Sequence, residues 1–196
     1  MTTARTDTPA AAAPPPADVA KAAELDAEAL ALLHPEHGGR EFVTALLNAE
    51  LFQDAVRFVA HALPKREAVW WALLCAREAA GDAPSADIRS ALDATDLWVR
   101  HPGDEQRRAA MAAAQKATFK TSAGCAGLAA FLSGGSLSVP GQPDVPPGPF
   151  LTAKAVTGGV SIASLGADPK TAPERFRRYV EQALHIGDQA GAWRKP

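Results

Sequence analysis

The sequence predicts an all-α fold: an irregular bundle of about seven or eight helices with one long loop rich in proline and glycine. Apolar residues recur at spacings of three and four along most of the chain, as on one face of a helix. The alternation of apolar and polar residues that marks a strand is essentially absent. No residue pattern repeats between the helical stretches, which favours an irregular bundle over a repeat solenoid.

The chain is long enough for one domain. It has 196 residues, of which 47% are hydrophobic, a composition that suffices for a core without disulfides or structural metals. Residues 1–17 contain mainly Thr, Ala and Pro, including three consecutive prolines, so we expect them to form a disordered tail. Residues 18–196 are predicted to form a single all-α domain.

Two helices are predicted between the tail and residue 63. Asp18 is a candidate N-cap for a helix over residues 18–33, and this helix ends before Pro35 because the residue before a proline avoids the helical region. A second helix covers residues 40–63 with a short break near Asn48, and it carries a broad apolar stripe.

The next predicted helix, over residues 64–77, is apolar on all sides in its middle. Such a helix is typically central, so we expect residues 66–78 to be the most buried helix, with Trp71 in the core. Lys65 and Arg66 lie in its first turn, and with Arg77 they either bind a carboxylate on a partner or cap the ends of a buried helix.

Three helices follow, over residues 85–100, 104–119 and 122–132. Ser85 is the expected N-cap of the first, and Thr121 or Ser122 that of the third. Arg107 and Arg108 are expected on a solvated face of the middle helix.

Ser133–Phe150 is the predicted loop. Its many prolines and glycines exclude a helix and an interior strand, so we expect an extended crossing of ~50 Å, at ~3 Å per residue. The segment has a single charged residue, Asp144, whereas a disordered linker carries more charge. We therefore expect an ordered strap over the helices, with Val145 and Phe150 buried beneath it.

Two helices complete the prediction. The helix over residues 151–165 contains Gly158 and Gly159, which predict close packing by another segment. Thr171 and Glu174 have the spacing of a capping box, and they open a helix that ends near residue 192. Trp193 follows that helix, where an aromatic side chain either folds back or contacts a partner.

Composition excludes several functions. The net charge of −2 argues against a nucleic-acid partner, because such binding depends on clustered Lys and Arg. No apolar run approaches the ~20 residues of a membrane span, and no signal-peptide pattern is evident, so the prediction is a cytoplasmic protein. Cys75 and Cys125 are expected to be buried free thiols.

Motif analysis predicts no catalytic residue, no metal and no cofactor. His34 and His37 lie beside a proline and before two glycines, in a loop rather than on the rigid helix that zinc-binding pairs use. The run Gly134–Ser138 resembles the first half of a nucleophile elbow but lacks the closing glycine and the preceding strand.

Two stretches resemble a known family: residues 52–71, from Phe52 to Trp71, and Phe131–Leu137 with its continuation through Pro146 and Pro147 to Ala153. The chain is similar over about residues 40–190 to an uncharacterised bacterial domain of unknown function, whose members are associated with type VI secretion gene neighbourhoods. The resemblance implies an accessory role, as adaptor, effector chaperone or regulator, and it transfers no catalytic residue.

The resulting hypothesis is a non-catalytic protein that binds another protein. Its candidate partner-binding residues are Lys65, Arg66, Gly134, Gly135, Ser136 and Trp193. One alternative is an enzyme or small-ligand binder with a pocket between the helices and the loop at 133–150. A further alternative is a structural subunit that self-associates through its alanine-rich helix faces.

Overall fold

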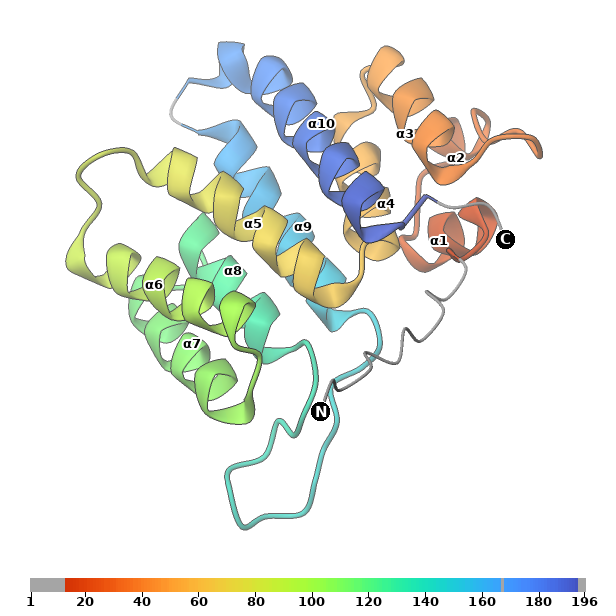
Figure 1. Ribbon diagram of the computed structural model, residues 1–196. Helices are drawn as coiled ribbons and strands as arrows, with labels where there is room; N and C mark the ends of the chain where they lie inside the picture. The colour runs from red at the N-terminus through yellow and green to blue at the C-terminus, as the bar shows by residue number, and fades with distance from the viewer. Residues whose placement is uncertain (1–12, 167, 194–196) are drawn as a thin grey trace, which may run out of the picture.

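The computed structural model describes residues 13–166 and 168–193, and it confirms the all-α prediction (Figure 1). Within these residues there are ten α-helices, one short 3-10 helix and no strand. The helices are α1 (Pro16–Ala22), α2 (Ala27–Leu30), α3 (Gly39–Asn48), α4 (Phe52–Ala62), α5 (Lys65–Ala80), α6 (Ala86–Arg100), α7 (Asp104–Ala117), α8 (Ser122–Phe131), α9 (Leu151–Leu165) and α10 (Ala172–Ala190).

Two of the expected helices are each divided in two. The helix expected over residues 18–33 becomes α1 and α2, and the one over residues 40–63 becomes α3 and α4. In both cases a glutamate in the left-handed region follows the first part, Glu24 with φ 52° and Glu50 with φ 60°. A left-handed residue at a helix end is usually glycine, and neither of these ends has one. The sequence pattern therefore predicted only the break near Asn48 and missed the one at Glu24.

The start of the domain also differs from the prediction. Helix α1 begins at Pro16, two residues earlier than expected, because a proline in the first turn fits the helix without losing a hydrogen bond. The expected tail covered residues 1–17, and residues 1–12 of it lie outside the described residues.

Helices α5 and α9 join the two sides of the molecule (Figure 1). Helix α5 packs against α6 and α8 on one side and α10 on the other, and α9 contacts α8, α4 and α10. Helices α6, α7 and α8 form one group, whereas α1 and α3 pack on α4, which contacts α10. The fold therefore depends on a central pair that is far apart in sequence.

Trp71 is a core residue, as predicted. Its side chain is fully buried, and its indole Nε1 donates a hydrogen bond to the Tyr179 carbonyl oxygen at 2.8 Å, which ties α5 to α10. The expectation that α5 is the most buried helix is wrong, because Trp70 and Leu74 are partly exposed. In α8, by contrast, nearly every residue is buried. Helix α8 consists mostly of alanine and glycine, so neighbouring helices approach it closely.

The close packing predicted at Gly158 and Gly159 is confirmed for the second of them. A Cβ atom built on Gly159 would lie 3.0 Å from the Cβ atom of Cys125, on α8. A Cβ atom built on Gly158 would have one neighbour within 4 Å, the Cys125 Sγ at 3.9 Å, which is an ordinary contact distance. Gly159 therefore sets the distance between α8 and α9, and Gly158 does not.

Of the four predicted N-caps, those at Ser85 and Thr121 are confirmed. Asp18 does not cap α1, because it lies inside this helix, whose N-cap is Pro15. The side-chain oxygens of Ser85 and Thr121 accept hydrogen bonds from backbone N–H groups in the first turns of α6 and α8. The capping box at Thr171 and Glu174 is wrong. A 3-10 helix at Pro169–Thr171 precedes α10, and in it the Thr171 hydroxyl donates to the Asp168 carbonyl oxygen instead of capping α10.

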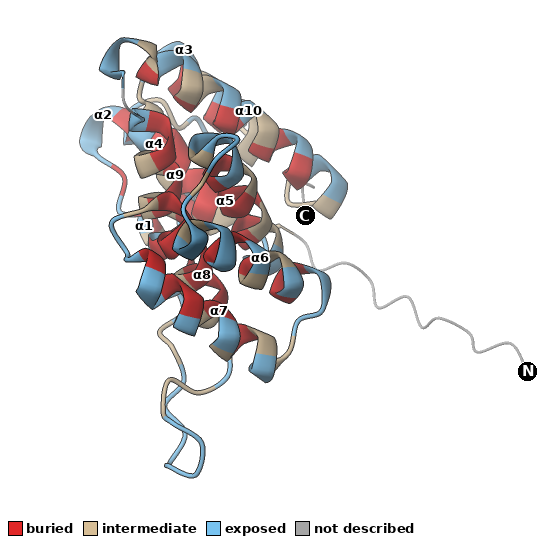
Figure 2. Ribbon diagram, turned by 90° about the vertical axis from the view of Figure 1, so that its left-hand side faces the viewer, coloured by how far each residue is buried: buried red, intermediate tan, exposed pale blue. Residues whose placement is uncertain are grey.

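Residues 133–150, called the finger below, project from the bundle and do not strap it (Figure 2). The end of α8 and the start of α9 lie together, since the Thr152 hydroxyl donates to the Leu132 carbonyl oxygen at 2.8 Å. No 50 Å crossing is needed, so the loop runs outward and returns. Val145 and Phe150, expected to be buried, are 50% and 44% exposed.

Candidate partner-binding site

The two limbs of the finger are joined at a neck. The Leu137 N–H donates to the Val145 carbonyl oxygen at 2.8 Å. The Ser136 Oγ accepts hydrogen bonds from the backbone N–H groups of Ser138, at 3.1 Å, and Val145, at 3.0 Å. Ser136 thus holds the limbs together, which assigns it a structural role in the neck.

Arg107 fixes the neck to the helices. Its Nη1 donates to the Phe131 carbonyl oxygen at 2.7 Å, and its Nη2 donates to the Ser136 carbonyl oxygen at 2.9 Å. The guanidinium lies 4.6 Å from the centre of the Phe131 ring and pairs with Asp104. One side chain from α7 therefore satisfies a free carbonyl at the end of α8 and a carbonyl of the finger.

The expectation that Arg107 lies on a solvated face is wrong, since the residue is 3% exposed. The finger and the end of α8 cover it. Gly135 lies directly against it with φ +65°, and a Cβ atom at this position would be 2.9 Å from the Arg107 Nη2. Only glycine fits both this conformation and this contact.

Lys65 reaches the finger from another helix. Its Nζ, at the start of α5, donates to the Ser133 carbonyl oxygen at 3.1 Å. The structure thus brings together four of the six candidate residues, Lys65 and the run Gly134–Ser136.

A cleft of about 450 Å³ opens at the base of the finger. It lies between α7 and the loop at 133–150, where the ligand-binding alternative expects a pocket, and it is lined by Asp104, Arg108, Gly135, Ser136, Asp144 and Pro146. Hydrogen bonds from Arg108 and Arg107 lower the pKa of the Asp104 carboxyl group. Asp104 therefore stays ionised and bound to the arginines at neutral pH, which suits an anchor rather than a general acid.

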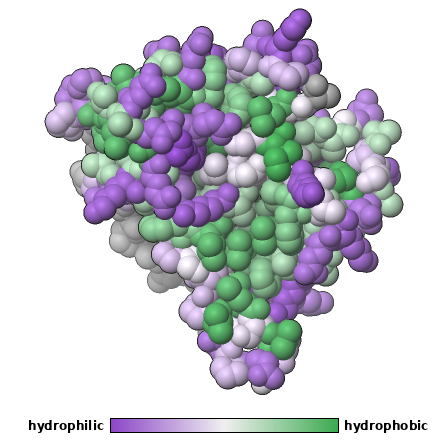
Figure 3. All heavy atoms as spheres, turned by 180° about the vertical axis from the view of Figure 1, so that it is seen from behind, coloured by the Kyte–Doolittle hydropathy of each residue, from purple (hydrophilic) through white to green (hydrophobic). Residues whose placement is uncertain are grey.

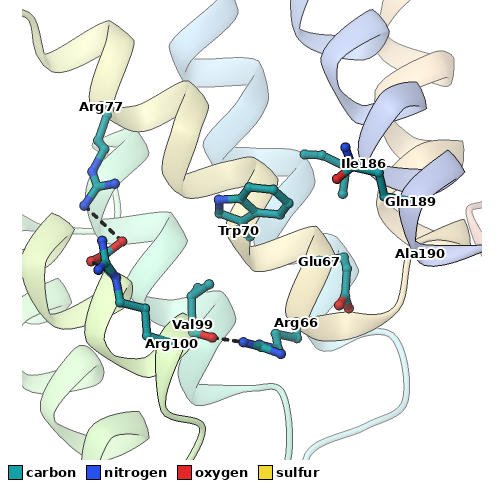
Figure 4. Close-up of a pocket in the computed structure, with 10 residues that line it drawn as sticks. Arg66, Glu67, Trp70, Arg77, Val99, Arg100, Ile186, Gln189 and Ala190 are labelled. Atoms are coloured by element: carbon teal, nitrogen blue, oxygen red, sulfur yellow. Dashed lines mark hydrogen bonds and ion pairs between the residues drawn. The ribbon is translucent and has the colours of Figure 1, made fainter. Parts of the chain in front are cut away.

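Arg66 points away from the finger into a groove between α5, α6 and α10 (Figure 4). Its Nε donates to the Val99 carbonyl oxygen at 2.7 Å. The groove has a volume of about 460 Å³, and the indole of Trp70 lies in its middle. Arg77 and Arg100 are on the same wall, and both pair with Asp96.

Trp193 folds back onto α10, one of its two expected fates. Its Nε1 donates to the Leu184 carbonyl oxygen at 3.0 Å. The ring lies against Gly187 on one side and Gly39 on the other, and a Cβ atom at Gly187 would be only 2.3 Å from it. Trp193 therefore closes the C-terminal end of α10 against the start of α3, apart from the finger and the groove.

Comparison with protein families places the chain. A family model described as a family of unknown function (DUF6931) matches residues 42–187. The chain belongs to DUF6931. The matched region corresponds to the range of the resemblance found in the sequence, and it contains the finger, the neck and most of the groove. Among curated proteins and solved structures, the comparisons found no match.

The DUF6931 region contains every candidate residue except Trp193. In the described part of the chain no helix is long and apolar enough to cross a membrane. Among those same residues, no three His, Cys, Asp or Glu side chains gather as a metal site.

Three residues of this DUF6931 chain matter here without having been candidates: Arg107, Arg108 and Trp70. The spacing of Asp104 three and four residues before the two arginines was a usable signal for ion pairs on α7. The burial of Arg107 had no such signal, because it depends on the finger returning to the helix. Trp70 belongs to the helix that was expected to be apolar and buried on all sides, but it is only partly buried and forms the floor of the groove.

Proposed function

We propose that this protein is a non-catalytic accessory protein that binds another protein through its finger. The observation that supports this is a pair of exposed apolar side chains on the finger: Val139, beyond the neck, is 65% exposed, and Val145, at the neck, is 50% exposed. Large apolar groups that protrude so far into water gain free energy when a partner covers them. A neck held by Arg107 keeps the finger in place, which reduces the entropy lost on binding.

The apolar surface extends beyond these two side chains. Phe150 and Leu151, where the finger returns to α9, are 44% and 38% exposed. Seen from behind, apolar atoms run from the middle of the molecule down to the finger (Figure 3). A partner that grips the finger therefore also has apolar surface to contact at its base.

The chemistry of the finger indicates the type of partner surface. Residues 143–148 form neither helix nor strand nor turn, and they contain three prolines, Pro143, Pro146 and Pro147. Extended proline-rich segments bind in grooves lined by aromatic side chains, because their conformation is largely set before binding. We propose an aromatic, apolar groove on the partner.

The cellular setting is the second part of the proposal. We place the protein in a bacterial type VI secretion system, as adaptor, effector chaperone or regulator. This part rests on the resemblance of residues 52–71 and 131–153 to a family associated with such gene neighbourhoods.

Affinity purification from the native host, followed by mass spectrometry, tests both parts. The wild-type protein is expected to recover secretion-system components. The double variant Val139→Asp/Val145→Asp is expected to recover about tenfold less, since it places charges where a partner would bury apolar groups. Its melting temperature is expected to stay unchanged, because both side chains face solvent.

Leu165→Asp is the matched control. Leu165 is 50% exposed, like Val145, but it lies at the opposite end of α9. Equal recovery by the double variant and the control would overturn the finger as binding site. Recovery of the chain's own copies alone, lost in the double variant, would instead support the self-associating alternative.

A further inference from the structure

We infer that the groove between α5, α6 and α10 is a second binding site, which takes a short acidic segment of a partner protein. The segment would place an apolar side chain on Trp70 and a carboxylate on Arg66. This site is independent of the finger, since Lys65 and Arg66 point to different places although they are adjacent in sequence.

The shape of the groove supports a peptide side chain as occupant. Its floor is the partly buried indole of Trp70, and Val99, Ile186 and Ala190 add apolar walls (Figure 4). A volume of about 460 Å³ has room for one or two side chains. Trp and Arg are also the residues that contribute most often to binding energy at protein interfaces.

The charges of the groove favour an anionic occupant. Its lining contains three arginines and two acidic residues, Glu67 and Asp96. The two carboxylate oxygens of Asp96 are taken by Arg77, at 3.1 Å, and Arg100, at 2.7 Å. The guanidinium of Arg66 forms no ion pair with any carboxylate of the described residues.

The hydrogen bonds of Arg66 define where the anion binds. Its Nε is already held by the Val99 carbonyl oxygen at 2.7 Å, and this bond fixes the plane of the guanidinium at the edge of the groove. The two Nη atoms remain, and together they match the two oxygens of one carboxylate. Asp or Glu next to an apolar residue on a partner supplies this combination.

The test uses two peptides that differ in charge only: acetyl-Ser-Leu-Glu-Leu-Ser-amide and the same peptide with Gln in place of Glu. Binding is followed by NMR at the indole N–H resonance of Trp70, assigned by its loss in Trp70→Phe. We expect a saturable shift with the Glu peptide and about tenfold weaker binding of the Gln peptide, the effect of one charge-assisted hydrogen bond.

Two variants separate the role of Arg66 from a general charge effect. Arg66→Gln is expected to bind both peptides equally weakly. Arg89→Gln, which removes the same charge from an exposed position on α6, is expected to keep the preference for Glu. The melting temperatures of both variants show whether the fold is intact.

Three results would overturn the proposal. The first is that neither peptide shifts the Trp70 resonance saturably, or that the wild-type chain binds both peptides equally well. The second is a preference for Glu that survives in Arg66→Gln. The third is a Trp70 shift that inorganic phosphate reproduces at the same concentration, or that protein concentration alone produces, which would assign the groove to a free anion or to a second copy.

Discussion

A single guanidinium, that of Arg107, connects α7, the end of α8 and the finger. Both of its Nη atoms donate to carbonyl oxygens, those of Phe131 and Ser136, and neither carbonyl is part of a regular helix hydrogen-bond ladder at that point. The charge itself is balanced by Asp104. At the residue scale, the position of the finger therefore depends on Arg107 together with Gly135, which lies directly against it.

Replacing Arg107 tests this directly. Arg107→Met keeps an apolar side chain beside the Phe131 ring but removes the donor of the Phe131 carbonyl oxygen and leaves the Ser136 carbonyl oxygen with only the long bond from Arg108, so the free energy of unfolding should fall by roughly 2–4 kcal/mol. Arg108→Met is the control, because Arg108 is more exposed and its bond to Ser136 is long, at 3.3 Å. It should cost less than about 1 kcal/mol in a urea melt. Equal losses in the two variants would contradict the anchoring role.

His61 makes the stability depend on pH. Burial lowers the pKa of His61 below its ordinary value of 6.5. The hydrogen bond from Nδ1–H to the Arg57 carbonyl oxygen raises the pKa, but this effect is smaller than that of burial. Lys154 lowers the pKa further and Glu24 raises it. The Nε2 atom is buried with no partner among the described residues, so a proton there is poorly solvated.

The sign of the effect follows from linkage. The unfolded chain takes up a proton as pH falls through 6.5, whereas the folded chain does so only at lower pH, so stability is full above 6.5 and decreases below it. Urea melts at about pH 7.5 and about pH 5 should show this decrease, and His61→Leu should reduce it. His185→Leu, at an exposed site on α10, should leave it in place. An unchanged slope in His61→Leu would exclude His61 as its source.

At the element scale, two helix starts that depend on a capping side chain were predictable, those of α6 and α8. Ser85 and Thr121 have the residue type and position that satisfy free backbone N–H groups, and both do so. The ends at Glu24 and Glu50 were not predictable as left-handed positions, because glutamate carries no preference for that conformation. At both ends the backbone N–H after the glutamate bonds back to a helix carbonyl oxygen, Leu25 to Ala20 and Leu51 to Leu46.

In the candidate site too, some residues could be predicted from local sequence and others could not. Gly134, Gly135 and Ser136 stood out because their composition interrupts the helical pattern. Arg107 did not, because its partner Ser136 lies 29 residues away and the contact exists only after the finger returns. The direction of the finger was mispredicted for a related reason: the antiparallel contact of α8 with α9, at Leu132 and Thr152, is a tertiary feature.

The contact between α8 and α9 gives a matched pair of substitutions. Gly159→Val should lower the free energy of unfolding by about 1–3 kcal/mol, because even its Cβ atom would be 3.0 Å from that of Cys125. Gly158→Ala should raise it by about 0.5–1 kcal/mol, since alanine favours the helix and the space is open. Denaturant melts measure both values, and a stable Gly159→Val would mean that the helices separate easily there.

At the scale of the whole molecule, the boundary of the domain is testable by truncation. Removing residues 1–12 should change the melting temperature by no more than about 1–2 degrees, because that segment has few large apolar side chains. Removing residues 1–22 should lower it by several degrees, since it deletes α1 with the buried Val19 and Ala20. Thermal melts of both chains distinguish a dispensable tail from an integral first helix. A large drop in the shorter truncation would show that residues 1–12 support the fold.

The central pair of helices has a consequence for synthesis on the ribosome. The bond between Trp71 and Tyr179 joins residues 108 positions apart. At about 5–20 residues per second, translation needs roughly 5–20 seconds to travel that distance. During this interval α5 has left the ribosome, but α10, which later covers Trp71, has not yet been synthesised. The newly made N-terminal half therefore presents apolar surface to the cell until the last helix arrives, so its yield in vivo should depend on translation speed and on chaperones.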